Sequence, residues 1–358
     1  MNSSFITVLD GGLGHELKLR GISYGTFVAG VLANEKKGGT SNNSKMVESI
    51  HRDYLTAGCD VITTNSFVAV PRRMIECGLA TNGADSNIRA AELIRASVDR
   101  ARAAIIEHEK KAGKGNRQRM IAGCVPPLTE CYFSRKVPTS VSDLTPEYTT
   151  IISTLLDCEV DILLAETLST TREALAILRS IFEFGNKKIG TQPTQPIWIS
   201  FTVHDDRPTK LRSDESLETA CKTIIQEASS LDLPLEAIGV NCSSPDAICC
   251  AVPVLVNIVE GSQIKVCAYG NCFKNTTSSW MRSLDEDAQC AEDSCATDGL
   301  KQTRFSSEDF DEEGYLLPDV YAKCASEFVR SGAKIVGGCC GSRPKHMCRV
   351  VSALRHQR

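Results

Sequence analysis

Eight short apolar segments, each followed by a segment of helical character, run along the chain and limit the folds that it can adopt. They lie at residues 6–10, 59–65, 120–125, 161–166, 197–203, 237–242, 265–271 and 334–338. Their apolar residues are consecutive and do not alternate with polar ones, which is typical of strands buried on both faces. Regular alternation of strand and helix predicts a parallel sheet, and eight such units are enough to close a (β/α)8 barrel. An open doubly wound sheet is the alternative, but no Gly-x-Gly-x-x-Gly motif follows the first strand.

The expected helices lie at residues 13–19, 44–57, 84–111, 145–158, 170–184, 214–230, 245–259, 315–331 and 344–354. Thr145 and Asp214 are predicted to cap two of them, with Pro146 as the first residue inside its helix. A single barrel domain is therefore predicted over residues 1–358. Residues 283–313, between the seventh strand and its helix, are acidic and weakly apolar. That composition predicts a flexible insertion, either a lid or a disordered segment.

The composition is ordinary for a soluble globular protein, with 42% hydrophobic and 23% charged residues. A formal net charge of -4 provides no polybasic surface, so neither a nucleic acid nor an anionic membrane is an expected partner. No signal peptide is evident, and no run approaches the ~18 apolar residues needed to span a bilayer. These features predict a cytoplasmic protein, in which the 17 cysteines are expected to be reduced thiols.

Two adjacent cysteines, Cys339 and Cys340, stand between glycines at the end of the eighth expected strand. Two thiolates on a strand-to-helix turn are poorly placed to bridge each other but well placed to bind one soft metal ion. Cys242 ends the sixth strand, and the C-terminal ends of barrel strands face one mouth, where the active sites of such barrels lie. Three protein ligands and one open position are the pattern of a catalytic zinc, so these three cysteines are the predicted Zn2+ ligands.

Other thiols and polar residues have weaker assignments. Cys249 and Cys250 are also adjacent, but they fall inside an expected helix and are therefore predicted to pack in the core. Cys124 and Cys272 lie at strand ends, where they either line the site or pack in the core. Further polar residues at the strand ends include Asp10, Thr64, Glu166 and Asn241.

Four motifs together resemble the zinc-dependent homocysteine S-methyltransferase family. They are Leu-Asp-Gly-Gly at 9–12, Leu-Ala-Glu-Thr at 164–167, Gly-Val-Asn-Cys at 239–242 and Val-Gly-Gly-Cys-Cys-Gly at 336–341. The resemblance implies that Cys242, Cys339 and Cys340 are the zinc ligands and that the carboxylates of Asp10 and Glu166 bind the amine of homocysteine. It also implies that Thr64 and Asn241 line the amino-acid pocket, and that residues 126–132 correspond to a donor-side loop.

The implied activity is methyl transfer from an onium donor, S-methylmethionine or S-adenosylmethionine, to the thiolate of L-homocysteine, which gives methionine. Betaine is an alternative donor. A zinc-buffering or thiol redox-sensing protein is an alternative of a different class, and Asp10 and Glu166 discriminate between them, because a zinc buffer has no use for an amino-acid pocket. The expected partners are homocysteine and the methyl donor, and the expected assembly is a monomer or a small homo-oligomer.

Overall fold

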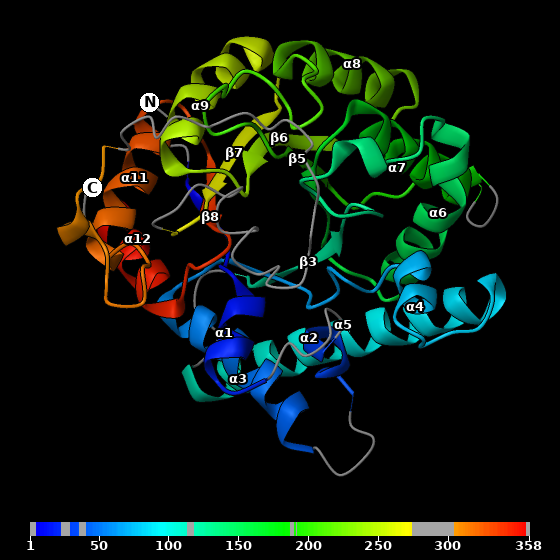
Figure 1. The fold of residues 1–358 in the computed structure, drawn as a ribbon, viewed down its shortest axis with the longest axis horizontal. Coiled ribbons are helices and arrows are strands. Elements are labelled where there is room, and N and C mark those ends of the chain that lie inside the picture. The colour runs from blue at the N-terminus through cyan, green and yellow to red at the C-terminus, as the bar shows by residue number, and fades with distance from the viewer. Residues whose placement is uncertain are drawn as a thin grey trace, which may run out of the picture.

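The eight predicted strands form one parallel sheet that curls into a barrel with helices around it (Figure 1). The structure, a computed structural model, describes residues 5–22, 29–35, 41–112, 118–186, 190, 192–273 and 304–355. The strand order is β1-β8-β7-β6-β5-β4-β3-β2. A parallel bridge between Leu9 and Val61 joins the two ends of this order. The predicted (β/α)8 barrel is confirmed.

The strands are short and end together at one mouth. They are β1 Thr7–Val8, β2 Val61–Thr63, β3 Met120–Val125, β4 Ile162–Leu168, β5 Ile197–Phe201, β6 Leu235–Asn241, β7 Lys265–Gly270 and β8 Ile335–Gly338. Near the mouth, Asn241 of β6 pairs with Tyr269 of β7, which pairs in turn with Gly337 of β8. This register brings the residues that follow β6 and β8 to the same level of the barrel, with only β7 between them.

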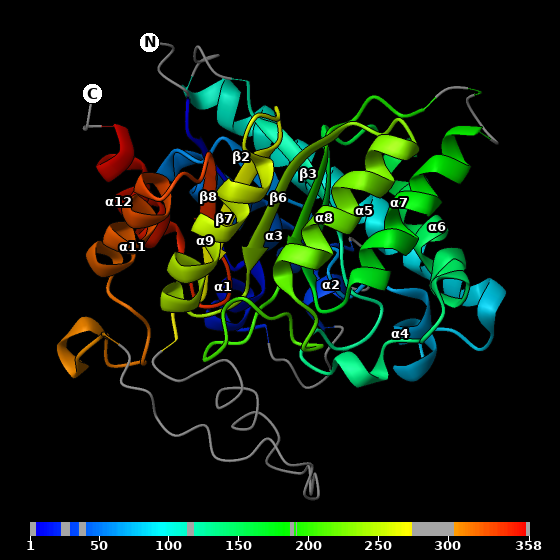
Figure 2. The ribbon, with the colours of Figure 1, turned by 90° about the horizontal axis from the view of Figure 1, so that it is seen from above.

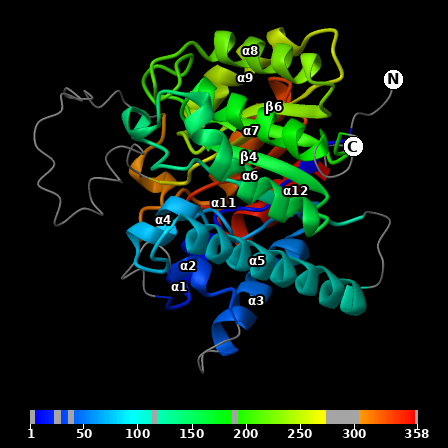
Figure 3. The same ribbon diagram turned by 90° about the vertical axis from the view of Figure 1, so that its right-hand side faces the viewer.

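Helices cover the outside of the barrel on all sides (Figures 1 and 2). They are α1 Leu13–Leu19, α2 Ala29–Leu32, α3 Ser41–Ala57, α4 Pro71–Glu76, α5 Gly83–Ala112, α6 Val141–Asp157, α7 Thr171–Phe184, α8 Leu217–Ser230, α9 Pro245–Val259, α11 Pro318–Arg330 and α12 Pro344–Arg355. The long α5 lies across α3 on the outer surface (Figure 3). Every expected helix is present, and α2 and α4 are additional. None of the helices in these described ranges is long and apolar enough to cross a membrane.

Four predicted helix starts are wrong. α3 begins at Ser41, three residues before its expected start. α6 begins at Val141 because Ser140 caps it, its Oγ accepting a hydrogen bond of 3.2 Å from the Ser142 amide. Pro146 therefore lies inside the helix, where it leaves one backbone carbonyl without its usual donor. α8 begins at Leu217 with Ser216 as its cap, and α11 begins only at Pro318.

The barrel interior is packed by a cluster of side chains from all eight strands or the residues next to them. It contains Leu9, Val61, Ala122, Ile162, Leu164, Trp198, Ala237, Cys267, Tyr269 and Ile335. A larger apolar cluster fills the space between strands and helices. Because apolar side chains fill the centre, polar side chains that point inward are left at the ends of the strands, where the predicted site lies.

The predicted insertion at 283–313 falls largely outside the described residues, which resume at Arg304. Residues 304–313 include a short 3-10 helix at Ser307–Asp309. The Arg304 guanidinium forms ion pairs with Asp246 of α9 and Glu327 of α11. The flexibility of residues 283–303 stays a prediction.

Candidate functional site

The three predicted ligand cysteines lie together at the mouth. The sulfur atoms of Cys242, Cys339 and Cys340 all lie within 4.8 Å of one another, and those of Cys242 and Cys340 are 3.7 Å apart. One ion can therefore contact all three sulfurs, and three soft thiolates suit zinc and similar metals. Cys242 is buried, whereas Cys339 and Cys340 are partly exposed, which leaves one side of the cluster accessible to a further ligand.

Close backbone approach shapes the turn that carries Cys339 and Cys340. A Cβ atom on Gly338 would lie 2.1 Å from the Ser342 Oγ, so this position accepts glycine alone. The Ser342 hydroxyl donates a hydrogen bond of 2.7 Å to the Cys339 carbonyl, and the Gly12 amide donates one of 3.1 Å to the Ser342 carbonyl. The loop after β1 therefore holds the cysteine turn in place.

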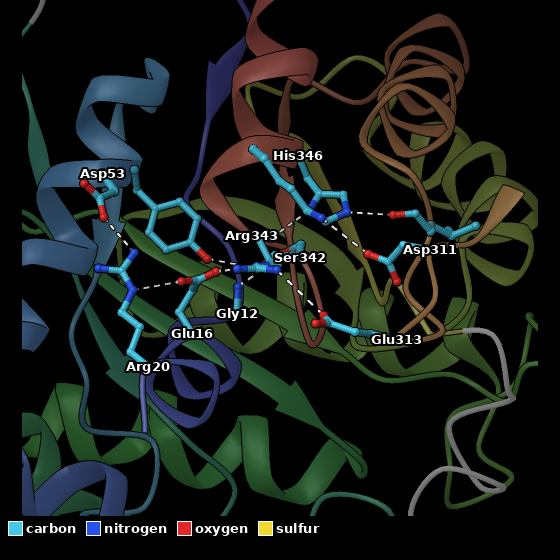
Figure 4. Close-up of polar contacts among 12 residues, drawn as sticks. Gly12, Glu16, Arg20, Asp53, Asp311, Glu313, Ser342, Arg343 and His346 are labelled. Atoms are coloured by element: carbon cyan, nitrogen blue, oxygen red, sulfur yellow. Dashed lines mark hydrogen bonds and ion pairs between the residues drawn. The ribbon is translucent and has the colours of Figure 1, made fainter. Parts of the chain in front are cut away.

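A network of ion pairs and hydrogen bonds holds the same turn in place (Figure 4). Glu16 of α1, with a side chain only 3% exposed, accepts hydrogen bonds from Arg343 Nε at 2.6 Å and Arg20 Nε at 3.0 Å. Arg20 also pairs with Asp53 of α3 at 2.7 Å. His346 accepts a bond of 3.0 Å from the Arg343 amide, and burial lowers its pKa to about 4, so its ring is neutral. These contacts tie α1, α3 and the start of α12 to the cysteine turn.

Cys242 has a strained backbone and several polar contacts. Its φ is 52°, in the left-handed region that residues other than glycine seldom adopt. Its carbonyl accepts a hydrogen bond of 3.2 Å from the Thr202 hydroxyl. Hydrogen bonds from Cys339, Cys340 and Tyr132 hold the pKa of the Cys242 thiol well below its ordinary value, despite burial.

Tyr132 is a neighbour of the cluster that the sequence did not single out. It lies in the loop after β3, and its hydroxyl is 2.8 Å from the Cys242 sulfur. The one feature of the sequence that pointed to it was its place in the loop after β3, which begins at the mouth of the barrel. No spacing rule links it to a cysteine 110 residues away.

Glu166 lies in β4 at an irregular place in the sheet. The register of β4 against β5 shifts between Ala165 and Leu168, and Thr167 has a φ of 62°. Such a bulge re-aims the adjacent side chains. One Glu166 oxygen accepts a hydrogen bond of 3.2 Å from the Cys124 thiol. Burial raises the pKa of Glu166 to about 7. Cys124 is therefore a buried neighbour of Glu166, and a role for it in the site stays a prediction.

Asp10 follows β1 and is only 2% exposed. Its carboxylate accepts two hydrogen bonds from Thr63, one of 2.9 Å from the amide and one of 2.8 Å from the hydroxyl. Burial raises its pKa to about 8, because these bonds offset only part of the desolvation. Asp10 thus ties β1 to β2 in addition to facing the mouth end of the barrel.

Thr64 and Asn241 have protein partners. The Thr64 hydroxyl accepts a bond of 2.9 Å from the Cys124 amide and lies 2.8 Å from the Ser66 hydroxyl. The Asn241 side chain exchanges two hydrogen bonds with Thr167, at 2.9 and 2.8 Å, and its Nδ2 is 3.8 Å from the Cys339 sulfur. Asn241 therefore connects the Glu166 region to the cysteine turn, and a substrate contact for either residue stays a prediction.

Three aromatic rings gather beside the cysteine turn. The ring centroids of His15 and Phe273 are 5.3 Å apart, and that of Tyr315 is 6.2 Å from Phe273. A Cβ atom on Gly341 would lie 2.8 Å from the Tyr315 ring, so the cluster packs directly on the turn. Burial lowers the pKa of His15 to about 4, which leaves its ring neutral. No sequence pattern predicted this cluster, since its members are far apart along the chain.

The second cysteine pair is not at the mouth. Cys249 and Cys250 lie in α9, as predicted, but only Cys249 is half-buried and Cys250 is exposed. The prediction that both pack in the core is therefore wrong for Cys250. Adjacent residues of a helix point in different directions, so Cys250 faces the solvent although Cys249 is half-buried. Cys272 is buried in the larger apolar cluster.

Comparison with known proteins gives one consistent result. The model of the family described as homocysteine S-methyltransferase matches residues 7–354. Homocysteine S-methyltransferase 1 of Arabidopsis thaliana is 21% identical over 98% of this chain and 94% of its own length. Homocysteine S-methyltransferase YbgG of Bacillus subtilis (strain 168) is 23% identical over 98% of this chain and 95% of its own length.

A solved structure shares the fold. The metallated form of the homocysteine methyltransferase MmuM from Escherichia coli superposes with a TM-score of 0.70 at 19% identity. The match covers 98% of this chain and 97% of that protein.

Proposed function

This chain belongs to the homocysteine S-methyltransferase family, and we propose that it transfers a methyl group from S-methylmethionine or S-adenosylmethionine to L-homocysteine, giving methionine. The proposal includes one zinc ion held by Cys242, Cys339 and Cys340. The observation that carries it is the convergence of these three sulfurs within 4.8 Å at the barrel mouth. The chain is a methyltransferase by family, which removes the zinc-buffering alternative.

The three cysteines would hold the metal and leave its accessible side for the substrate sulfur. A bound zinc ion would lower the pKa of the homocysteine thiol, which is about 8.5 for a free thiol, and so supply a thiolate at neutral pH. The Ser342 and Asn241 contacts to the turn support a preformed arrangement of the ligands. Preformed ligands favour binding because less ordering is required when the metal arrives.

Glu166 is the proposed principal partner of the substrate ammonium. It accepts one hydrogen bond from a weak donor, the Cys124 thiol, which an ammonium group can displace. Asp10 already accepts two bonds from Thr63, so we assign it a supporting electrostatic role in the same pocket. A charge-assisted bond to a buried carboxylate is worth roughly 1.5–3 kcal/mol.

The aromatic cluster of His15, Phe273 and Tyr315 supports an onium donor. The faces of aromatic rings attract cations, and a neutral His15 adds no repulsion. In the transfer, the methyl carbon forms a bond to the homocysteine sulfur while its bond to the donor sulfur breaks. The electron pair of the broken bond stays on the donor sulfur, which becomes a neutral thioether. The leaving group therefore needs no general acid, and the protein mainly aligns the two substrates.

The test is methionine formation by the purified protein with homocysteine and, separately, S-methylmethionine, S-adenosylmethionine and betaine. We expect turnover with one or both sulfonium donors. Cys339→Ser should abolish it and Cys249→Ser should leave it unchanged. Turnover with betaine alone would replace the proposed donor, and no methionine from any donor would contradict the proposal.

A further inference from the structure

The hydroxyl of Tyr132 lies within hydrogen-bond distance of one of the three cysteine sulfurs. Its oxygen lies 2.8 Å from the Cys242 sulfur and 3.4 Å from the Cys242 carbonyl oxygen. In the free protein either the phenol or the thiol can donate the proton. A metal-bound cysteine is a thiolate without a proton, so the phenol must then be the donor.

Other contacts hold the Tyr132 ring in position. The Arg212 guanidinium carbon lies 5.2 Å from the ring centroid, as in a cation–π contact. Arg212 is itself fixed, because its side chain is 5% exposed and pairs with Asp205 at 3.6 Å. The Ser134 hydroxyl donates a bond of 3.0 Å to the Arg212 carbonyl, which ties the Tyr132 loop to the loop after β5. The phenol is therefore directed at the sulfur by contacts that need no metal.

The hydrogen bond from Tyr132 would offset part of the negative charge of the cysteine cluster. The negative charges of three thiolates outnumber the positive charges of a divalent ion, and a fourth thiolate from the substrate increases the excess. Excess charge in a buried site is costly unless hydrogen bonds and nearby cations offset it. Tyr132 supplies a hydrogen bond and Arg212 supplies a cation on the Cys242 side, where burial is greatest.

We propose that Tyr132 is a positioning residue that donates a hydrogen bond to the Cys242 thiolate, withdraws charge from that sulfur and strengthens metal retention. The inference rests on the proposed metal centre. Ligand-supporting contacts of this kind typically change metal affinity by about 10- to 100-fold. Arg212 orients the phenol and acts on the metal through Tyr132.

Cobalt substitution tests the contact directly. Co2+ bound by thiolates shows sulfur-to-metal charge-transfer bands, and a hydrogen bond to the sulfur lowers the energy of its lone pairs. In Tyr132→Phe these bands should move to longer wavelength, while the ligand-field bands keep their four-coordinate shape. Competition with a chromophoric chelator should show about 10- to 100-fold weaker metal affinity. Arg212→Lys should shift the bands in the same direction by less.

The matched control is Tyr148→Phe, which removes the same hydroxyl from a buried tyrosine of α6. It should change neither the spectrum nor the affinity, and thermal melts of the metal-free proteins should show that all variants fold. If Tyr132→Phe fails to fold, the Arg212→Lys spectrum decides. Wild-type spectrum and affinity in Tyr132→Phe would overturn the inference alone. Altered ligand-field bands would mean that the phenol oxygen is a ligand, which also overturns it. A wild-type protein that binds no cobalt would overturn the metal centre as well.

Discussion

The chain contains two pairs of adjacent cysteines that differ in their backbone. Cys339 and Cys340 lie in the turn after β8, and both sulfurs approach Cys242. Cys249 and Cys250 lie in α9, where successive side chains are rotated by about 100° around the axis. Cys249 contacts Glu327 of α11, with its sulfur 3.5 Å from Oε2, whereas Cys250 is exposed. The same dipeptide therefore forms a candidate metal centre only where a strand-end turn lets both thiols face one point.

The surroundings of the two pairs differ as well. The mouth pair lies close in sequence to Arg343, which pairs with Glu16, a carboxylate that is 3% exposed. The helix pair lies beside the ion pair of Arg304 and Glu327, whose side chains are 39% and 33% exposed. Among the described residues, only the mouth pair belongs to a group of side chains that could hold a metal. Substitutions at the two places should separate these differences.

The largest expected effect is loss of metal. Cys339→Ser should reduce zinc from about one ion per chain to nearly none, because a three-thiolate site loses one of its ligands. Cys249→Ser should keep the wild-type content. Elemental analysis of protein purified without added metal measures both. Full occupancy in Cys339→Ser would remove the distinction between the two pairs.

The next effect concerns the carboxylate beside each pair. Glu166→Gln keeps the size of the side chain but loses its charge, so homocysteine affinity should fall by about 10- to 100-fold. Zinc content should not change, because the carboxylate is no proposed ligand. Glu327→Gln, beside the helix pair, should leave affinity unaltered. Isothermal titration gives the affinities, and equal binding by Glu166→Gln and the wild type would remove Glu166 from the pocket.

Stability should also differ between the two surroundings. Glu16→Gln deprives two arginines of a buried carboxylate and should lower the free energy of unfolding by about 2 kcal/mol. Glu327→Gln breaks a partly exposed pair and should cost less than about 1 kcal/mol. Urea denaturation of the metal-free proteins compares them. Equal losses of unfolding free energy in the two variants would show that the Glu16 network stabilises the protein no more than the Arg304–Glu327 pair does.

The smallest expected effect is a pH dependence at the mouth. The pKa of Glu166 is about 7, and its ionised form is the one that attracts an ammonium group. The contribution of Glu166 to amino-acid affinity should therefore rise by about tenfold or less from pH 6 to pH 8 and then level off. Methionine is the suitable probe, because it shares the ammonium group and has no thiol that titrates.

Glu166→Gln should flatten this profile, apart from a remaining rise from Asp10, whose pKa is about 8. Glu327 should show no such behaviour. Desolvation is the largest single influence and opposes its ionisation, but the hydrogen bond and charge of Arg304, together with smaller contributions from Cys249 and Arg330, lower its pKa on balance. A rise in affinity that persists unchanged in Glu166→Gln would assign the titration to another group.

The sequence predicted the convergence of the cysteines because parallel strands of a barrel end at one mouth. Once β6 and β8 were recognised, Cys242 had to lie near Cys339, whatever their separation along the chain. Glu166 and Asp10 were placed at the mouth by the same argument. The argument gives the position of a residue on its strand but not its hydrogen-bond partners, so the Asn241 contacts to Thr167 were out of its reach.

Features that depend on loops were not predictable. Tyr132, Phe273 and Tyr315 lie outside the helices and strands, whereas His15 lies in α1, so no common pattern places these side chains beside the cysteines. The start of α6 was misplaced because proline favours a first helical turn, whereas Ser140 supplies a competing cap five residues before Thr145. Local preferences of this size are easily outweighed by tertiary packing.

The left-handed backbone at Cys242 lowers the stability of the fold at a residue that the proposed metal site needs. A φ of 52° costs a residue other than glycine roughly 1–2 kcal/mol, and Cys339 and Cys340 are not among the described residues with positive φ. Glycine at 242 would relieve this cost and remove a proposed metal ligand at the same time. For the metal-free protein, laboratory selection for heat resistance alone would therefore favour variants that have lost this cysteine, and only selection that also demands metal binding would retain it.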